Sequence, residues 1–185
     1  GSVAIFYAKY FLGGDASVQS TFMATGVTAA ILAMPVSTYI TKHYCKVKLF
    51  KYTQLAVGVI SLVMFFVVKP GDMVLAYVIY FILSFVVDLH APVFWSAIAE
   101  AVDYGHAESG KRVSGLSFGG ISFAQKAGMG VAGAAVGYLL DFFEYSPDGV
   151  QGESTLIGLA LMLTIIPGVF HVIMGGLMFR YKITD

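Results

Sequence analysis

Residues 99–112, AEAVDYGHAESGKR, carry six ionisable side chains between Glu100 and Arg112, whereas 12% of the whole chain is charged and 58% is hydrophobic. Long apolar runs, 73–97 and 115–140, lie on either side of this stretch. Such runs are typical of membrane spans, because a helix needs about 20 apolar residues to cross the hydrocarbon core. The charged stretch is therefore predicted to connect two spans.

The same pattern of apolar runs extends over the whole chain. A span must be helical, because backbone groups in lipid have to find their hydrogen-bond partners inside the segment. The runs are about twice as long as a barrel strand and do not alternate, which excludes a β-barrel. The sequence predicts an all-α integral membrane protein with one partial and five full spans: 3–12, 19–41, 47–68, 73–97, 115–140 and 155–179.

Composition excludes several other classes of protein. The one cysteine, Cys45, permits neither an intrachain disulfide nor a CxxC motif, and the net charge of zero gives no basic surface for nucleic acid. The chain contains no phosphate-binding loop, zinc motif or nucleophile elbow. We therefore expect no enzyme activity, no metal site and no nucleic-acid partner.

The basic residues indicate how the spans are oriented. Eight of the 11 lysines and arginines fall in the segment 42–51, at 111–112, or after the last predicted span. Because basic loops face the cytoplasm, these three segments and the C-terminus are predicted to be cytoplasmic. This orientation makes residues 99–112 a cytoplasmic connection.

Two interpretations of that connection remain open. In the first, its charges are simply solvated. In the second, they form ion pairs with another membrane domain that break and reform, since exposed pairs contribute only ~0–1 kcal/mol each. The second interpretation predicts a short helix or turn at the membrane surface with paired side chains. Its candidate gating residues are Glu100, Asp103, Tyr104, Lys111 and Arg112.

Four ionisable side chains lie within the predicted spans: Asp88, His90, Lys126 and His171. An intramembrane charge is costly and needs a partner or a water-filled cavity. Lys126 is flanked at i−4 and i+4 by Ser122 and Gly130, which predicts an open, polar face around the ammonium. Lys126 would either act in transport or bridge two helices, and the glycines of this span would otherwise serve close helix packing.

Three further side chains have two interpretations each. Asp88 and His90 are two residues apart and point to different helix faces, so one would face a cavity while the other packs. Trp95 would anchor the interface or stack on a sugar ring. His171 follows Pro167 by four residues and is expected to bond the carbonyl that the proline frees.

The segment FWSAIAEAVDYGHAESGKRVSGLSFGGISFAQKAGMGVAGAAVGYLL, residues 94–140, resembles the signature region of the glycoside–pentoside–hexuronide:cation symporters. This family is the melibiose-permease-like branch of the major facilitator superfamily. The matching features are Trp95, Val102-Asp103-Tyr104-Gly105, Gly110-Lys111-Arg112 and the lone Lys126. The chain departs from the family at Ser114, where many relatives carry an acid, and at Cys45, where a glycine is common.

The resemblance implies a major-facilitator-type helical bundle, of which this chain is the C-terminal six-helix half: the end of helix 7 plus helices 8–12. It implies sugar:cation symport across the inner (cytoplasmic) membrane, with lipid, a sugar substrate and an N-terminal half as partners. That N-terminal half would supply most of the Na⁺ or H⁺ site. Lys126, Ser122, Trp95 and Asp88 are the residues expected to bind substrate or couple it to the ion.

Two other functions remain open. A membrane scaffold or sensor domain would bind a partner without transporting anything. A membrane enzyme would use Asp88, His90 and Lys126, but these residues lack the spacing of a shared metal site or catalytic triad.

Overall fold

A computed structural model of the chain describes residues 2–110, 114–147 and 149–180. These residues form helices, π-helical and 3-10 turns and connections, with no strand among them. The elements in chain order are α1 (Ser2–Phe6), η1 (Tyr7–Phe11), α2 (Ala16–His43), α3 (Lys46–Val67), α4 (Met73–Asp88), α5 (Ala91–Ser109), α6 (Ser114–Phe142), α7 (Glu153–Leu163), α8 (Ile165–Leu177) and η2 (Met178–Arg180). The predicted all-α fold is confirmed.

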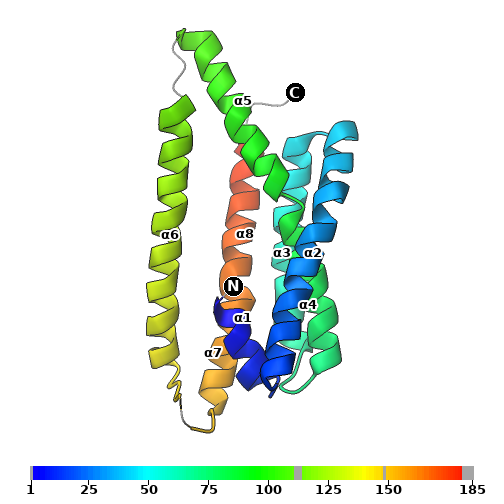
Figure 1. Cartoon of the computed structure of the whole chain (residues 1–185), viewed down its shortest axis with the longest axis vertical. Helices are drawn as coiled ribbons and strands as arrows, with labels where there is room; N and C mark the ends of the chain where they lie inside the picture. Colours follow the sequence, from blue (N-terminus) through cyan, green and yellow to red (C-terminus); the bar gives the residue numbers. More distant parts are fainter. Residues whose placement is uncertain (1, 111–113, 148, 181–185) are drawn as a thin grey trace.

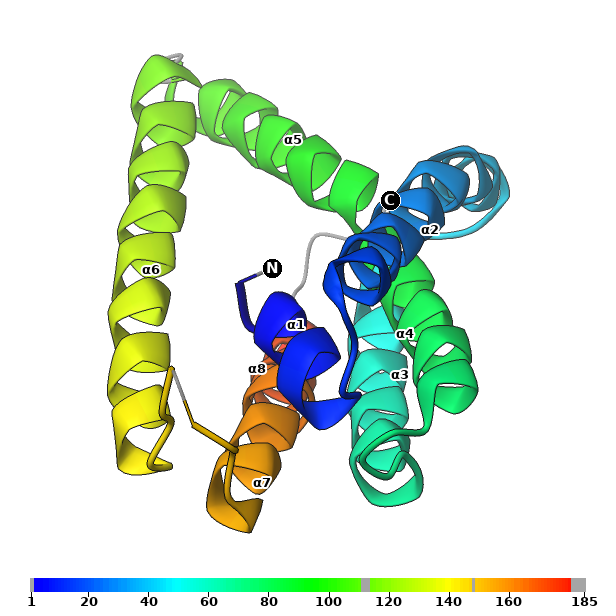
Figure 2. The same cartoon turned by 60° about the horizontal axis from the view of Figure 1, so that its bottom comes forward.

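The helices are unevenly packed. α3 packs extensively against α8, and α2 packs against α4, so that α2, α3, α4 and α8 make up the dense part of the bundle. α1 and η1 lie against α7 and α2. α6 stands to one side, joined to the rest through α5 at one end and α7 at the other, as Figures 1 and 2 show. None of the residues of α6 is buried.

Four helical stretches are long and apolar enough to cross a membrane: Ala16–His43, Lys46–Val67, Met73–Ala107 and Glu153–Arg180. α6 covers the predicted span 115–140 and has 29 residues, but it is not among the four. The reason is composition, since seven glycines together with serine, glutamine and lysine dilute its apolar residues. These residues make α6 rich in small side chains over its whole length.

Two of the predicted spans are interrupted. The range 73–97 is divided by a turn at Leu89-His90, and 155–179 is divided at Thr164. A proline follows each break, Pro92 in the first turn of α5 and Pro167 in the first turn of α8. Proline lacks an N–H and clashes with the carbonyl of the preceding turn, so a new helix begins there instead of the old one continuing.

The charge density of residues 99–112 predicts a connection at the membrane surface with a short helix or turn. The structure differs in the length of the helix. Residues 99–109 form the second half of α5, which continues as regular helix to Ser109. Charged side chains are compatible with a helix once it extends beyond the apolar layer. The helix ends at Gly110, whose φ of 68° is left-handed and strained for other residues. Lys111 and Arg112 lie outside the described residues.

The ends of the bundle alternate along the chain. The α2–α3 connection and the end of α5 lie at one end, and the connections α3–α4 and α6–α7 lie at the other (Figure 1). This arrangement brings the basic segment 42–51 and the charged end of α5 to the same end of the molecule.

The contact between α3 and α8 depends on glycine. A Cβ added at Gly168 would lie 2.8 Å from the Cβ of Ser61, which cannot move without its helix, whereas one added at Gly176 of the same helix meets nothing within 4 Å. We expect Gly168→Ala to destabilise the full-length protein by ~1–3 kcal/mol through overpacking. Gly176→Ala is the matched control and should be neutral or slightly stabilising. Thermal unfolding in detergent compares the two, and equal midpoints would contradict the α3–α8 packing.

Candidate functional site

Asp88 lies on the wall of a cavity of about 640 Å³ in the middle of the bundle. Tyr80, Ser84 and Asp88 recur every four residues along α4 and present one polar stripe to this cavity. His171 and Pro167 of α8 line the opposite wall, and Met129 and Gly133 of α6 contribute another part. The cavity therefore combines an acid, an imidazole and hydroxyl groups in otherwise apolar surroundings.

Ser122 and Lys126 continue the side of α6 that borders this cavity. They precede the cavity-lining residues Met129 and Gly133 by seven positions, which places them on the same helical stripe. Both side chains are exposed. An ammonium here can donate up to three hydrogen bonds to whatever covers the stripe.

The described part of the chain gives no support to a bridging role for Lys126. No described carboxylate forms an ion pair with it. The glycines around it do not serve close packing within this chain either, because a Cβ added at Gly119, Gly130 or Gly133 would meet nothing within 4 Å. The small-residue face of α6 is therefore open.

Trp95 lies on α5, about two turns after Asp88. Its side chain is 42% exposed, and its ring packs edge-on against Phe94 with centroids 5.4 Å apart. It does not line the Asp88 cavity. The structure thus separates Trp95 from the cavity that Asp88 lines.

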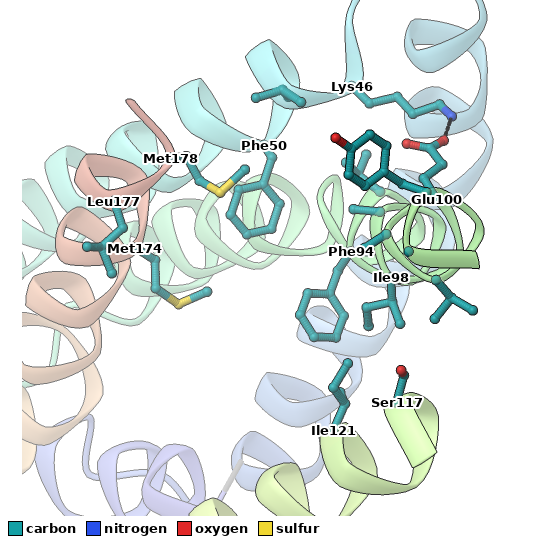
Figure 3. Close-up of a pocket in the computed structure, with 17 residues that line it drawn as sticks. Lys46, Phe50, Phe94, Ile98, Glu100, Ser117, Ile121, Met174, Leu177 and Met178 are labelled. Carbon is teal, nitrogen blue, oxygen red and sulfur yellow. Dashed lines mark hydrogen bonds and ion pairs between the residues drawn. The ribbon is translucent and has the colours of Figure 1, made fainter. Parts of the chain in front are cut away.

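A second cavity of about 790 Å³ lies between the ends of α3, α5, α6 and α8 (Figure 3). Its walls are mostly apolar, with Phe50, Phe94 and Met174 among them. The ion pair between Lys46 and Glu100 closes one edge. Tyr104 also lines this cavity.

A charged residue of α5 pairs across the bundle with α3. Lys46 at the start of α3 forms an ion pair with Glu100, and its Nζ donates to Ser96 Oγ at 3.2 Å. Ser96 Oγ in turn donates to Glu100 Oε1 at 3.2 Å. The sequence analysis missed this pair, although it predicts that the two oppositely charged segments share one side of the membrane.

The analysis also missed Gln54, a fully buried amide on α3. His171 Nδ1 hydrogen-bonds to Gln54 Oε1, so the expected bond from His171 to the carbonyl freed by Pro167 is not the one that forms. The sequence contains a signal for a polar face on α3, because Gln54 and Ser61 are seven residues apart in an apolar run. In the structure both side chains are buried on one face of this helix.

These features define a multi-pass, all-helical membrane protein with polar side chains gathered around internal cavities. Over residues 1–185 the chain matches the family described as MFS/sugar transport protein, and it belongs to that family. The resemblance to sugar:cation symporters seen in the sequence is thereby confirmed.

Curated relatives extend this finding. The chain is 29% identical to the inner membrane symporter YicJ of Escherichia coli (strain K12), over 98% of this chain and 39% of that protein. It is 30% identical to the uncharacterized symporter YnaJ of Bacillus subtilis (strain 168), over 90% of this chain and 35% of that protein. It is 22% identical to the glucuronide carrier protein homolog of Escherichia coli (strain K12), over 98% of this chain and 40% of that protein. The chain spans roughly two fifths of the length of such relatives. No solved structure gives a significant match.

The Lys46–Glu100 pair is testable by a double-mutant cycle on the full-length protein. We expect Lys46→Gln and Glu100→Gln to be coupled by ~0.2–1 kcal/mol in thermal stability, because the pair is partly exposed. Lys48→Gln is the matched control, since Lys48 is exposed two residues further along α3 and its effect should simply add to that of Glu100→Gln. Additivity of Lys46→Gln with Glu100→Gln would contradict the pairing.

Proposed function

We propose that this chain is the C-terminal half of a secondary active transporter that moves a sugar or glycoside together with Na⁺ or H⁺. Membership of the MFS/sugar transport family supports this function, as do relatives that are named symporters or, in one case, a glucuronide carrier. The coverage of roughly two fifths of those relatives fits one of two six-helix halves. No catalytic activity is proposed.

The observation that carries the proposal is the exposed Ser122–Lys126 stripe of α6. Transporters of this superfamily pair two halves around a site near the membrane midplane. An exposed lysine on a helix too rich in glycine to suit lipid is the expected appearance of a surface that the other half covers. The N-terminal half is therefore the proposed partner of α6.

Lys126 is the proposed coupling residue. Without the coupling ion, its ammonium pairs with the carboxylates of the ion site in the N-terminal half. The entering ion displaces the ammonium, which then donates hydrogen bonds to sugar hydroxyls. Each ligand thus stabilises one state of a bistable pair of domains, and the binding of each favours the other. Ser122, Asp88 and Trp95 are proposed to contribute to the same substrate pathway.

The end of the bundle that carries the basic segment 42–51 is proposed to face the cytoplasm, together with the C-terminus, in the inner membrane. At this end the Lys46–Glu100 pair links α3 to α5. Asp103, Tyr104, Lys111 and Arg112 are proposed to act with Glu100 as a gate, because exposed pairs are weak enough to break and reform during domain motion.

Substitution of Lys126 tests the proposal. In the full-length protein we expect Lys126→Arg and Lys126→Ala to fold and express normally but to lose cation-dependent sugar accumulation by roughly tenfold or more, since a planar guanidinium does not replace a compact ammonium at a tight site. Uptake into proteoliposomes with a sugar panel, with and without Na⁺, provides the measurement.

Lys69→Ala is the matched control, because Lys69 is an exposed lysine in the α3–α4 turn and its loss should leave accumulation unchanged. Full accumulation by either Lys126 variant would end the coupling role. A wild-type protein that transports no sugar under any ion gradient would overturn the transport function and leave the scaffold or sensor interpretation.

A further inference from the structure

Three polar side chains from three segments meet in the apolar interior of the bundle. Gln54 of α3 is fully buried and accepts a hydrogen bond from His171 of α8. The His90 ring lies at the α4–α5 break, edge-on to His171 with ring centroids 6.2 Å apart. The His90 ring also lies edge-on to the ring of Phe50, one turn before Gln54, with ring centroids 5.2 Å apart. The two imidazoles therefore flank the same face of α3.

Two atoms of this cluster are buried without a hydrogen-bond partner in the described part of the chain. They are Gln54 Nε2 and His90 Nδ1. The amide nitrogen is a donor, and the imidazole Nδ1 is an acceptor in one neutral tautomer and a donor when the ring is charged. A buried polar atom without a partner is costly, so a cluster holding two such atoms has the capacity for a further bond.

The cluster has a connection to water. His171 lines the cavity of about 640 Å³, and Asp88, two residues before His90, lines the same cavity. A cavity of this size with several polar groups is large enough to hold water. A proton can therefore reach His171 from the cavity, with Asp88 as the acid on the opposite wall.

Few other charges face the cluster. α8 contributes no titratable group besides His171, and the buried face of α2, which includes Ala33 and Ser37, contributes none. α4 contributes Tyr80 in addition to Asp88, both on the cavity.

The lysines at the start of α3 are engaged elsewhere. Lys46 pairs with Glu100 of α5, and Lys51 lies over the Phe179 ring at 4.1 Å. A positive charge on the imidazoles would therefore have Asp88 as its nearest counter-charge among the described groups that face it.

We propose that His90 and His171, together with the Gln54 amide that accepts a hydrogen bond from His171, form a binding site for one proton, which either imidazole can hold. The proton comes from water in the Asp88 cavity and adds to an imidazole nitrogen, so the pair passes from neutral to a single positive charge with no other bond broken. A second proton is excluded, because two charged rings 6.2 Å apart in this interior would repel strongly.

The test is a titration of the full-length protein with ¹⁵N-labelled histidine in lipid nanodiscs, in which the ring nitrogen shifts report protonation. From about pH 8 to about pH 4 we expect the His90 and His171 signals to share one midpoint and to take up one proton together. The exposed His43 and His106 lie outside the cluster, and their signals serve as internal controls. His→Gln variants at the four positions assign the signals.

A substitution in α3 isolates the role of the amide. Gln54→Met keeps the length of the side chain but removes the hydrogen bond from His171, so the proton should be divided differently between the two rings, with one midpoint still common to both signals. Thr53→Val is the matched control, because Thr53 is buried beside Gln54 and its hydroxyl bonds only its own helix, to Leu49 O and Phe50 O. Its titration should equal that of the wild type.

Three results would overturn the proposal. The first is that both buried rings stay neutral over the whole range. The second is that each ring takes up its own proton, for a total of two. The third is that Gln54→Met leaves the division of the proton between the two rings unchanged. The wild-type titration decides the first two even where the Gln54→Met protein does not fold.

Discussion

The need to satisfy every backbone hydrogen bond within the hydrocarbon layer governs this structure. It makes each apolar run a helix, and it makes each interruption of a helix a position that needs a polar partner. At the α4–α5 break Ser37 of α2 donates to the Leu89 carbonyl at 2.5 Å, and at the α7–α8 break Thr164 donates to the Ala160 carbonyl at 2.6 Å. Both hydroxyls are buried, so each break is compensated from within the protein.

The same constraint distinguishes α6 from the other helices. Its backbone is satisfied internally over 29 residues, but no residue of it is buried, and its large apolar side chains, such as Phe123 and Val131, are exposed. Its attachments are Leu139 and Leu140 near α7 at one end and the contact with α5 at the other. α6 is thus held at its ends, and its glycine face is open.

Sequence patterns identified the helical regions because apolar length is a local property. They failed where two local signals conflicted. The charge density of 99–109 suggested a connection, whereas Gly110 sets the actual end of α5. The run 73–97 is continuous in its apolar residues, whereas Pro92 lies in the first turn of a new helix within it.

The candidate site was less accessible to prediction. Asp88, His171 and Lys126 stood out as charges in apolar runs, but their arrangement depends on which helices pack together. The partner of His171 is 117 positions away in the chain, at Gln54, and the partner of Glu100 is 54 positions away, at Lys46. No local pattern contains such pairings, since they arise from the packing of α3 against α8 and α5.

The helix breaks and the ionisable residues occur together for an electrostatic reason. Asp88 is the last residue of α4, where the carbonyl ends of the helix carry partial negative charge and oppose an ionised carboxylate. No basic side chain of the described residues pairs with it. The same break places His90 two residues further along the chain, so one interruption of α4–α5 brings an acid and an imidazole close together in the sequence at the point where the helix ends.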